Sequence, residues 1–119
     1  MASHNDLGNK GEQLAVDYLK KQHYKILARN YRFQKAEIDI IAQKDDILAV
    51  IEVKTRSSSY FGNPQDFVNK KKIELLVKAT NHYIEIHDLD LEIRFDIIAI
   101  IHKNNSTEIE HLEAAFYYF

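Results

Sequence analysis

The hydrophobic residues of this chain follow a helical spacing in some segments and a strand-like pattern in others. Over residues 6–22 the apolar positions recur at intervals of three, four and seven, which predicts a helix with one buried face. Asn5 or Asp6 is placed to cap this helix. The same spacing predicts a second helix that begins at Asp66 or Asn69 and runs to about residue 86.

Five segments rich in apolar and β-branched residues are predicted to be strands: 24–32, 37–42, 47–54, 93–101 and 107–112. The third is almost continuously apolar, which is typical of a central strand covered on both faces. A short turn at residues 44–46 predicts an antiparallel hairpin, and residues 55–65 are predicted to be a loop. Because the second helix separates the third and fourth strands, it predicts a crossover and a parallel pair. The expected fold is α/β, with a mixed sheet of about five strands flanked by helices.

The length and composition of the chain exclude several classes of protein. The 119 residues (14.0 kDa) suit a single domain over residues 1–119, with a core at about 5–116. The absence of cysteine excludes a disulfide scaffold, a thiolate zinc site, an iron–sulfur cluster and a cysteine nucleophile. No apolar run approaches the ~20 residues of a membrane helix, and the first residues do not resemble a signal peptide. We therefore expect a cytoplasmic protein with no membrane partner.

The charged residues are segregated along the chain, although the net charge is only −2. Residues 20–35 carry six Lys or Arg and no acid, and residues 53–80 carry six against two acids. Residues 85–119 carry eight acids against two basic residues. This distribution allows one basic face that could bind a polyanion, and an ordinary solvated surface would give the same pattern.

Acidic residues lie on the strands that are predicted to be central. Glu37 and Asp39 share one face of the second strand, and Glu52 and Lys54 share one face of the third. The predicted hairpin makes these two pairs neighbours. An uncompensated carboxylate in such a place costs several kcal/mol, so a partner, water or a metal ion must offset it.

Three interpretations of these residues are open. The first is an internal salt bridge between Lys54 and either Glu52 or Asp39. The second is a site for a hard cation, held by Asp39, Glu52 and the backbone carbonyl of Val53, with Lys54 orienting a water or neutralising charge on a phosphorane. The third, a carboxylate pair for glycoside chemistry, fits least because the chain has no Trp to line a sugar cleft.

The spacing of Asp39, twelve intervening residues, and then Glu52, Val53 and Lys54 resembles the core motif of the PD-(D/E)xK nuclease superfamily. A longer ordered set of residues is similar to the bacterial UPF0102 (YraN-like) family, which is regarded as related to archaeal Holliday junction resolvases. The resemblance covers roughly residues 8–116. The residues that match the family are Gly8, Gly11, Glu12, Ala15, Tyr18 and Leu19, and residues 26–32, 37–42, 52–56, 62–64 and 94–99.

This resemblance implies a restriction-endonuclease-like core and a phosphodiesterase site that uses Mg²⁺ or Mn²⁺. Asp39 and Glu52 match the metal-binding acids, Lys54 the superfamily lysine, and Glu12 the acid on the first helix of the resolvase-like branch. The expected function is a metal-dependent endonuclease that acts on DNA, including branched DNA. Two alternatives are a nucleic-acid-binding accessory protein that keeps the nuclease fold without efficient cleavage, and an interaction module with an internal ion-pair network.

Basic residues on either side of these acids are expected to follow a phosphate backbone without reading bases. Lys72 could face the cleft while Lys70 and Lys71 meet solvent, and a solvated run of charge is the simpler interpretation of all three. The full set of expected nucleic-acid contacts is Arg29, Arg32, Arg56, Lys70 and Lys72. A homodimer would help so small a domain engage a symmetric branched substrate. The aromatic residues 116–119 could supply that contact or fold back on the core.

Two further groups of residues are expected to be structural. Asp96 is expected to pair locally with Arg94. The six histidines show no metal-ligand spacing and are expected to be surface or structural residues.

Overall fold

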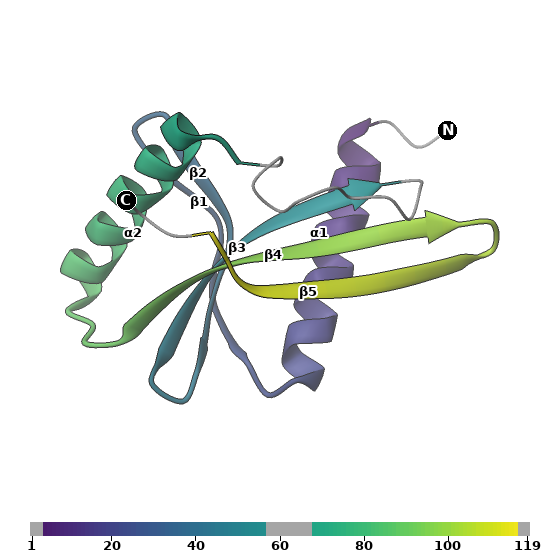
Figure 1. Cartoon of the computed structure of the whole chain (residues 1–119). Helices are drawn as coiled ribbons and strands as arrows, with labels where there is room; N and C mark the ends of the chain where they lie inside the picture. The colour runs from purple at the N-terminus through teal and green to yellow at the C-terminus, as the bar shows by residue number, and fades with distance from the viewer. Residues whose placement is uncertain (1–3, 57–67, 117–119) are drawn as a thin grey trace.

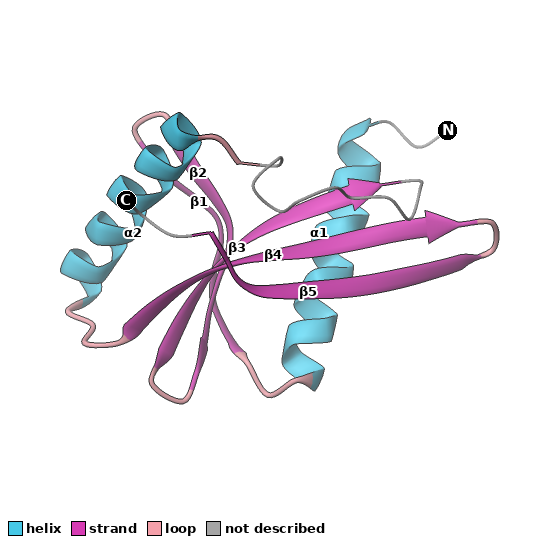
Figure 2. Ribbon diagram, in the orientation of Figure 1, coloured by secondary structure: helices cyan, strands magenta, loops and turns pink. Residues whose placement is uncertain are grey.

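The computed structural model describes residues 4–56 and 68–116, which form two helices and five strands (Figures 1 and 2). The predicted elements are present, although β3 extends into the predicted loop and β5 extends beyond residue 112. The expected cap of the first helix is wrong, because α1 begins at His4 and Asn5 and Asp6 lie inside it. The rest of the predicted loop and the tail 117–119 lie outside the described residues. In chain order the elements are α1 (His4–Lys21), β1 (Lys25–Phe33), β2 (Ala36–Lys44), β3 (Ile47–Arg56), α2 (Lys70–His87), β4 (Glu92–Lys103) and β5 (Ser106–Phe116).

The strands form one mixed sheet in the order β1-β2-β3-β4-β5. Only β3 and β4 are parallel among these strands, and the other neighbours are antiparallel. The crossover through α2 connects the parallel pair, as the order of elements predicted. The expected α/β fold with a five-stranded mixed sheet and flanking helices is therefore confirmed.

The sheet has an apolar core on each face. Leu76 and Tyr83 of α2 pack with Ile97 in one buried cluster. Leu19 of α1 packs with Ile98 in the other. Because neighbouring residues of β4 belong to different clusters, the central strands are covered on both faces, which explains their continuous apolar sequence. Among the described residues, neither helix is long and apolar enough to cross a membrane.

The first turn of α2 is fixed by a cap. Asn69 is the N-cap, and its side-chain oxygen accepts a 2.8 Å hydrogen bond from the backbone N–H of Lys72. The structure thus selects Asn69 over Asp66 as the start of the helix. The cap holds three consecutive lysines, Lys70, Lys71 and Lys72, at the end of α2 that approaches the sheet.

A glycine brings α1 against the end of β3. Gly11 is buried, and a Cβ atom at this position would lie 2.4 Å from Oγ1 of Thr55. Thr is β-branched and its side chain has few alternative rotamers, so a larger residue at position 11 would push α1 away from the strand. Glu12 follows Gly11 directly and is therefore held near the same end of β3.

The pairing of β2 with β3 stops in the middle of the sheet. It runs from Lys44 opposite Ile47 to Ile40 opposite Ile51. Beyond that point β2 continues to pair with β1, and β3 continues to pair with β4. At the same level of β1, Asn30 has a φ of 51°. The two central strands therefore separate where Asp39 and Glu52 would otherwise face each other.

Candidate metal and phosphate site

A pocket of about 490 Å³ opens where β2 and β3 separate, and we call it the acid pocket. Strands β2 and β3 and the N-terminal part of α2 contribute its walls. Asp39 and Glu52 both lie in these walls, so the two acids singled out from the sequence share one cavity. The acid pocket is lined by Lys35, Ala36, Glu37, Asp39, Glu52, Asn69, Lys71, Lys72, Leu75 and Leu76.

Glu52 is buried and is held by two ammonium groups. Only 6% of the residue is exposed. Its Oε1 atom lies 2.5 Å from Nζ of Lys72 and 3.3 Å from Nζ of Lys54. The predicted salt bridge with Lys54 is therefore present, but the shorter contact comes from α2 on the other side of the pocket. A buried carboxylate needs such partners, because an unpaired one would carry a large desolvation penalty.

Asp39 is half-buried, and its side chain accepts a hydrogen bond from β3 beyond the point where the pairing of β2 with β3 ends. Its Oδ2 atom accepts a 2.9 Å hydrogen bond from the backbone N–H of Val53. Burial, the charge of Glu52 and, more weakly, the charge of Glu12 raise the pKa of Asp39 from 3.8 to about 7, against the opposing effects of Val53 and Lys72. Asp39 therefore changes charge close to neutral pH, which is uncommon for an aspartate.

Glu12 acts on Asp39 from the α1 side of the sheet. It is half-buried, and it does not line the acid pocket. With its amide nitrogen turned toward Glu12, Asn30 donates to both carboxylate oxygens, at 3.2 and 3.3 Å. Because the negative charge of Glu12 contributes to the raised pKa of Asp39, the two acids belong to one electrostatic cluster.

The donor atoms of this cluster suit a hard cation. Two carboxylates lie close enough for the charge of one to raise the pKa of the other, and the ammonium groups of Lys54 and Lys72 supply positive charge there. Among the described residues, no group of three or more Asp, Glu, His or Cys side chains is placed to hold a metal ion. Mg²⁺ commonly takes only one or two carboxylates from a protein, with water and phosphate oxygens filling the remaining positions.

Of the five basic residues expected to contact nucleic acid, Lys72 is the one in the wall of the acid pocket. Lys35 and Lys71 also line it, and Lys71 is exposed to solvent, as expected from the sequence. Lys70 is exposed outside the pocket wall. One turn of α2 and the β1–β2 turn thus bring three ammonium groups to a cavity that contains two acids.

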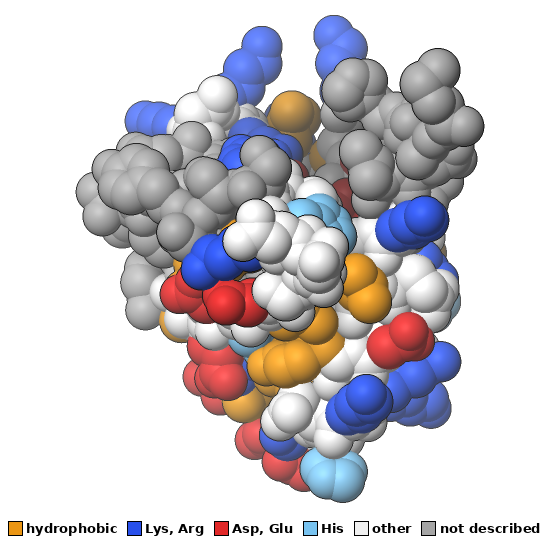
Figure 3. Space-filling view, turned by 90° about the vertical axis from the view of Figure 1, so that its right-hand side faces the viewer, with side chains coloured by type: hydrophobic (Ala, Val, Ile, Leu, Met, Phe, Trp, Pro, Cys, Tyr) orange, Lys and Arg blue, Asp and Glu red, His pale blue; other side chains and the backbone are white. Residues whose placement is uncertain are grey.

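The three arginines of that set lie outside the pocket wall and have local partners. Arg29 donates to Oε1 of Gln13 at 2.9 Å, and Arg32 pairs with Glu37 at 3.2 Å. Arg56 donates to the backbone oxygen of Thr55 at 3.0 Å. The face in Figure 3 shows acidic side chains mainly on its left and basic side chains mainly at its top and lower right.

Comparison with known proteins shows the family to which the chain is related. The pattern of the "Uncharacterised protein family UPF0102" matches residues 11–100, a span that includes Glu12, Asp39, Glu52 and Lys54. The chain belongs to the UPF0102 family. A UPF0102 protein of Flavobacterium psychrophilum is 62% identical over the full length of both chains, and one of Christiangramia forsetii is 60% identical, also over the full length of both. A relative in Bacteroides thetaiotaomicron is 43% identical over 98% of this chain and 97% of its own. The family resemblance seen in the sequence is confirmed.

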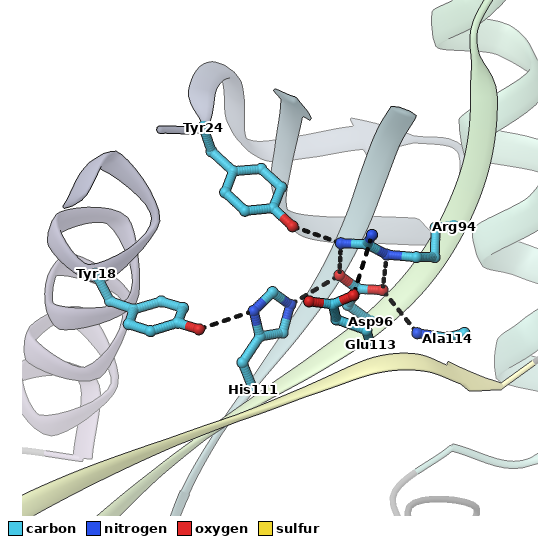
Figure 4. Close-up of polar contacts among 7 residues, drawn as sticks. All are labelled: Tyr18, Tyr24, Arg94, Asp96, His111, Glu113 and Ala114. Carbon is cyan, nitrogen blue, oxygen red and sulfur yellow. Dashed lines mark hydrogen bonds and ion pairs between the residues drawn. The ribbon is translucent and has the colours of Figure 1, made fainter. Parts of the chain in front are cut away.

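The UPF0102 protein contains a second polar cluster, on the α1 face of the sheet (Figure 4). Asp96 is fully buried and accepts two 2.9 Å hydrogen bonds from Arg94, which confirms the expected pairing. It also accepts from Nε2 of His111 at 2.8 Å and from the backbone N–H of Ala114 at 3.0 Å. Burial alone would raise the pKa of Asp96, but the donors His111, Arg94 and Ala114 outweigh it and lower that pKa.

This cluster fastens β5 and α1 to the centre of the sheet. Tyr18 of α1 bonds to Nδ1 of His111 at 3.1 Å, and Tyr24 accepts from Arg94 at 2.5 Å. Arg94 also pairs with Glu113 at 3.3 Å. The roles of His111, Tyr18 and Tyr24 were missed by sequence reasoning, because they depend on how β5, α1 and the start of β1 pack against β4. The cluster lies outside the wall of the acid pocket, and its satisfied hydrogen bonds indicate a structural role.

Proposed function

We propose that this UPF0102 protein is a metal-dependent phosphodiesterase that cleaves DNA, including branched DNA, at the acid pocket. The observation that carries this proposal is the shared cavity of Asp39 and Glu52, in which the charge of Glu52 helps to raise the pKa of Asp39 to about 7. The charge of Glu52 makes a second negative charge at Asp39 unfavourable, and a divalent cation between the two would offset this cost. The lysines around the same cavity favour a phosphate-bearing substrate.

A divalent cation bound here would polarise a phosphoryl oxygen and lower the pKa of a coordinated water. Asp39 and Glu52 would hold Mg²⁺ or Mn²⁺, and the backbone carbonyl of Val53 would complete the share of the protein. Asp39 must lose its proton before it can bind a cation, so the affinity for metal rises as the pH passes through about 7.

Lys54 lies 3.3 Å from the same oxygen of Glu52 and is placed to orient the attacking water or to neutralise charge on the phosphorane. Glu12 would act as a further acid from the α1 side, by adding negative charge near Asp39. In this scheme Glu52 positions Lys54 as well as the cation. A change at Glu52 would therefore disturb both functions at once.

DNA would be bound mainly through its backbone. Lys35, Lys71 and Lys72 lie in the pocket wall and would contact the phosphate that is cleaved. Phosphates farther along the strand would meet four basic residues outside the pocket, and a second copy of the chain would engage the other half of a symmetric junction. Such binding weakens steeply as salt is added. The four outer residues are Arg29, Arg32, Arg56 and Lys70.

A cleavage assay tests this proposal. Purified protein is incubated with duplex, single-stranded and four-way DNA in Mg²⁺ or Mn²⁺, beside an Asp39→Ala variant. The wild type is expected to cut and the variant to lose cutting, and removal of the metal by a chelator is expected to stop the wild type. Equal cutting by both proteins would point to a contaminating nuclease and would refute the enzymatic role.

A second function, a nucleic-acid-binding accessory protein without efficient cleavage, is favoured by one observation. Glu52 is already neutralised by Lys54 and Lys72, so its charge is balanced without a metal. The same assay separates the two functions. An accessory protein would shift four-way DNA on a gel, with a steep salt dependence, and would release no product from any substrate in either metal.

A further inference from the structure

We propose that Lys72 occupies the position of the cation when the acid pocket holds no metal, and that metal binding transfers its ammonium group to the substrate phosphate. This inference rests on the proposed metal site. Nζ of Lys72 lies 2.5 Å from Oε1 of Glu52, and its charge also favours the ionised form of Asp39. One ammonium group therefore serves both acids, as a bound cation would.

Lys72 is better suited to move than Lys54, the other partner of Glu52. Lys54 follows Glu52 by two residues on the same face of β3, so its backbone keeps it beside that carboxylate. Lys72 reaches Glu52 from α2, lines the pocket, and has a side chain that is 36% exposed, against 23% for Lys54. The long flexible stem of a lysine can swing its ammonium group to another acceptor while the helix stays in place.

Arrival of a divalent cation at Asp39 and Glu52 makes the observed position of Lys72 unfavourable, because like charges within ~4–6 Å of each other repel. The released ammonium group remains in the pocket wall with those of Lys35 and Lys71, where a phosphate is its natural acceptor. Metal and phosphate-bearing substrate therefore bind with positive coupling. Without metal, Glu52 holds the ammonium group of Lys72 away from DNA, so this group can bind the substrate phosphate only after metal has bound.

Calorimetric titration of the full chain with Mn²⁺, in the absence of DNA, tests the inference through metal affinity alone. Lys72→Met is compared with Lys71→Met, a matched control that removes one charge from the same pocket and the same turn of α2. Lys72→Met is expected to bind Mn²⁺ about five- to tenfold more tightly than the wild type, in the usual range of coupling between sites. Lys71→Met is expected to stay within about twofold, because no contact of Lys71 with the acids has to be broken.

Thermal unfolding supplies a second readout that guards against a damaged fold. Without metal, Lys72→Met is expected to melt at a lower temperature than Lys71→Met, since Glu52 loses a partner. Saturating Mn²⁺ is expected to raise its melting temperature by more than it raises that of the control. Melting temperatures that respond equally to Mn²⁺ in both variants would overturn the inference.

The outcomes separate this inference from the proposed function. If the wild type binds Mn²⁺, Asp39→Asn does not, and the two lysine variants bind equally, only the role of Lys72 is refuted. If neither the wild type nor any lysine variant binds Mn²⁺, the metal site and the inference fall together. Weaker binding by Lys72→Met than by Lys71→Met would show that Lys72 supports the metal instead of replacing it, and this also refutes the inference.

Discussion

Replacement of Asp39 by Asn removes a half-buried charge that the folded protein tolerates poorly. The amide of Asn has the shape of the carboxyl group, and its oxygen can still accept the hydrogen bond from the N–H of Val53. Between pH 3.8 and about 7 the folded protein keeps a proton on Asp39 that the unfolded chain has lost. The free energy of unfolding of the wild type therefore falls as the pH rises through this range. In Asp39→Asn this contribution is absent, because the amide does not titrate, so its free energy of unfolding does not fall for this reason.

The pKa of Asp39 sets the size of the effect. A rise from 3.8 to about 7 corresponds to at most roughly 4 kcal/mol of free energy of unfolding above about pH 8. Because Asp39 is only half-buried, solvent screens part of this, and we expect Asp39→Asn to be more stable than the wild type by about 1–2 kcal/mol at about pH 8. The two proteins should be almost equally stable at about pH 4.

Urea unfolding at several pH values between about 4 and 8, without metal, measures this difference. Glu37→Gln is the control, because Glu37 lies on the same strand and lines the same pocket but is exposed and paired with Arg32. Its stability relative to the wild type should change little with pH. The reasoning is refuted if Asp39→Asn is the less stable protein at about pH 8, or if its difference from the wild type is the same at every pH.

Three further changes probe other parts of the structure. Lys54→Met should leave Mn²⁺ binding in place by calorimetry but reduce the rate of cleavage by about a hundredfold or more, since it removes the group that we propose assists the attack; a rate within twofold of the wild type would exclude that role. Gly11→Ala should lower the free energy of unfolding by about 1–3 kcal/mol in urea, because its Cβ would meet Thr55, and an unchanged midpoint would contradict the close approach of α1. Asp96→Asn should cost about 3–5 kcal/mol near neutral pH, because the charge of Arg94 loses its buried partner. Since the pKa of Asp96 is lowered in the folded state, this cost should be complete above about pH 4 and fade in more acidic solution, and a constant difference across that range would argue against the network.

Most of the fold could be predicted from the sequence, because the hydrophobic period of each segment matches its burial. The apolar run of β3 indicated a strand covered on both faces, and Ala49, Val50 and Ile51 are indeed almost wholly buried. The position of α2 between β3 and β4 was enough to predict their parallel pairing, since the connection rules for such units allow little else.

Only some of the residues that meet in the acid pocket could be predicted from the sequence. Period-two alternation brought Asp39 and Glu52 toward one another, but it could not show that β2 and β3 separate there and that Asp39 bonds to the backbone of Val53. The approach of Lys72 to Glu52 depends on how α2 crosses the sheet, which is a tertiary property. A sequence pattern favours the nearer partner, Lys54, because the two residues share a strand face.

The network around Asp96 shows a different limit. Its pairing with Arg94 follows from their positions two apart on one strand. The contact from Ala114 depends on a register shift in β5, between Phe95 opposite Phe116 and Ile97 opposite Leu112, whereas His111 lies opposite Ile98 and reaches Asp96 through the regular pairing of β5 with β4. Ala114 has a φ of 50° at this shift, a conformation that residues other than Gly, Asn and Asp rarely adopt. No local residue preference signals such a bulge, so the cluster could not be read from the pattern.

The central claim is that Asp39 and Glu52 jointly bind a divalent cation, and crystals grown with Mn²⁺ at about pH 8 test it most directly. Anomalous scattering from Mn²⁺ should give a peak in the acid pocket within about 2.2 Å of an oxygen atom from each carboxylate. Nζ of Lys72 should then have left Oε1 of Glu52. A peak elsewhere, or no peak in the pocket at saturating Mn²⁺, would contradict the account.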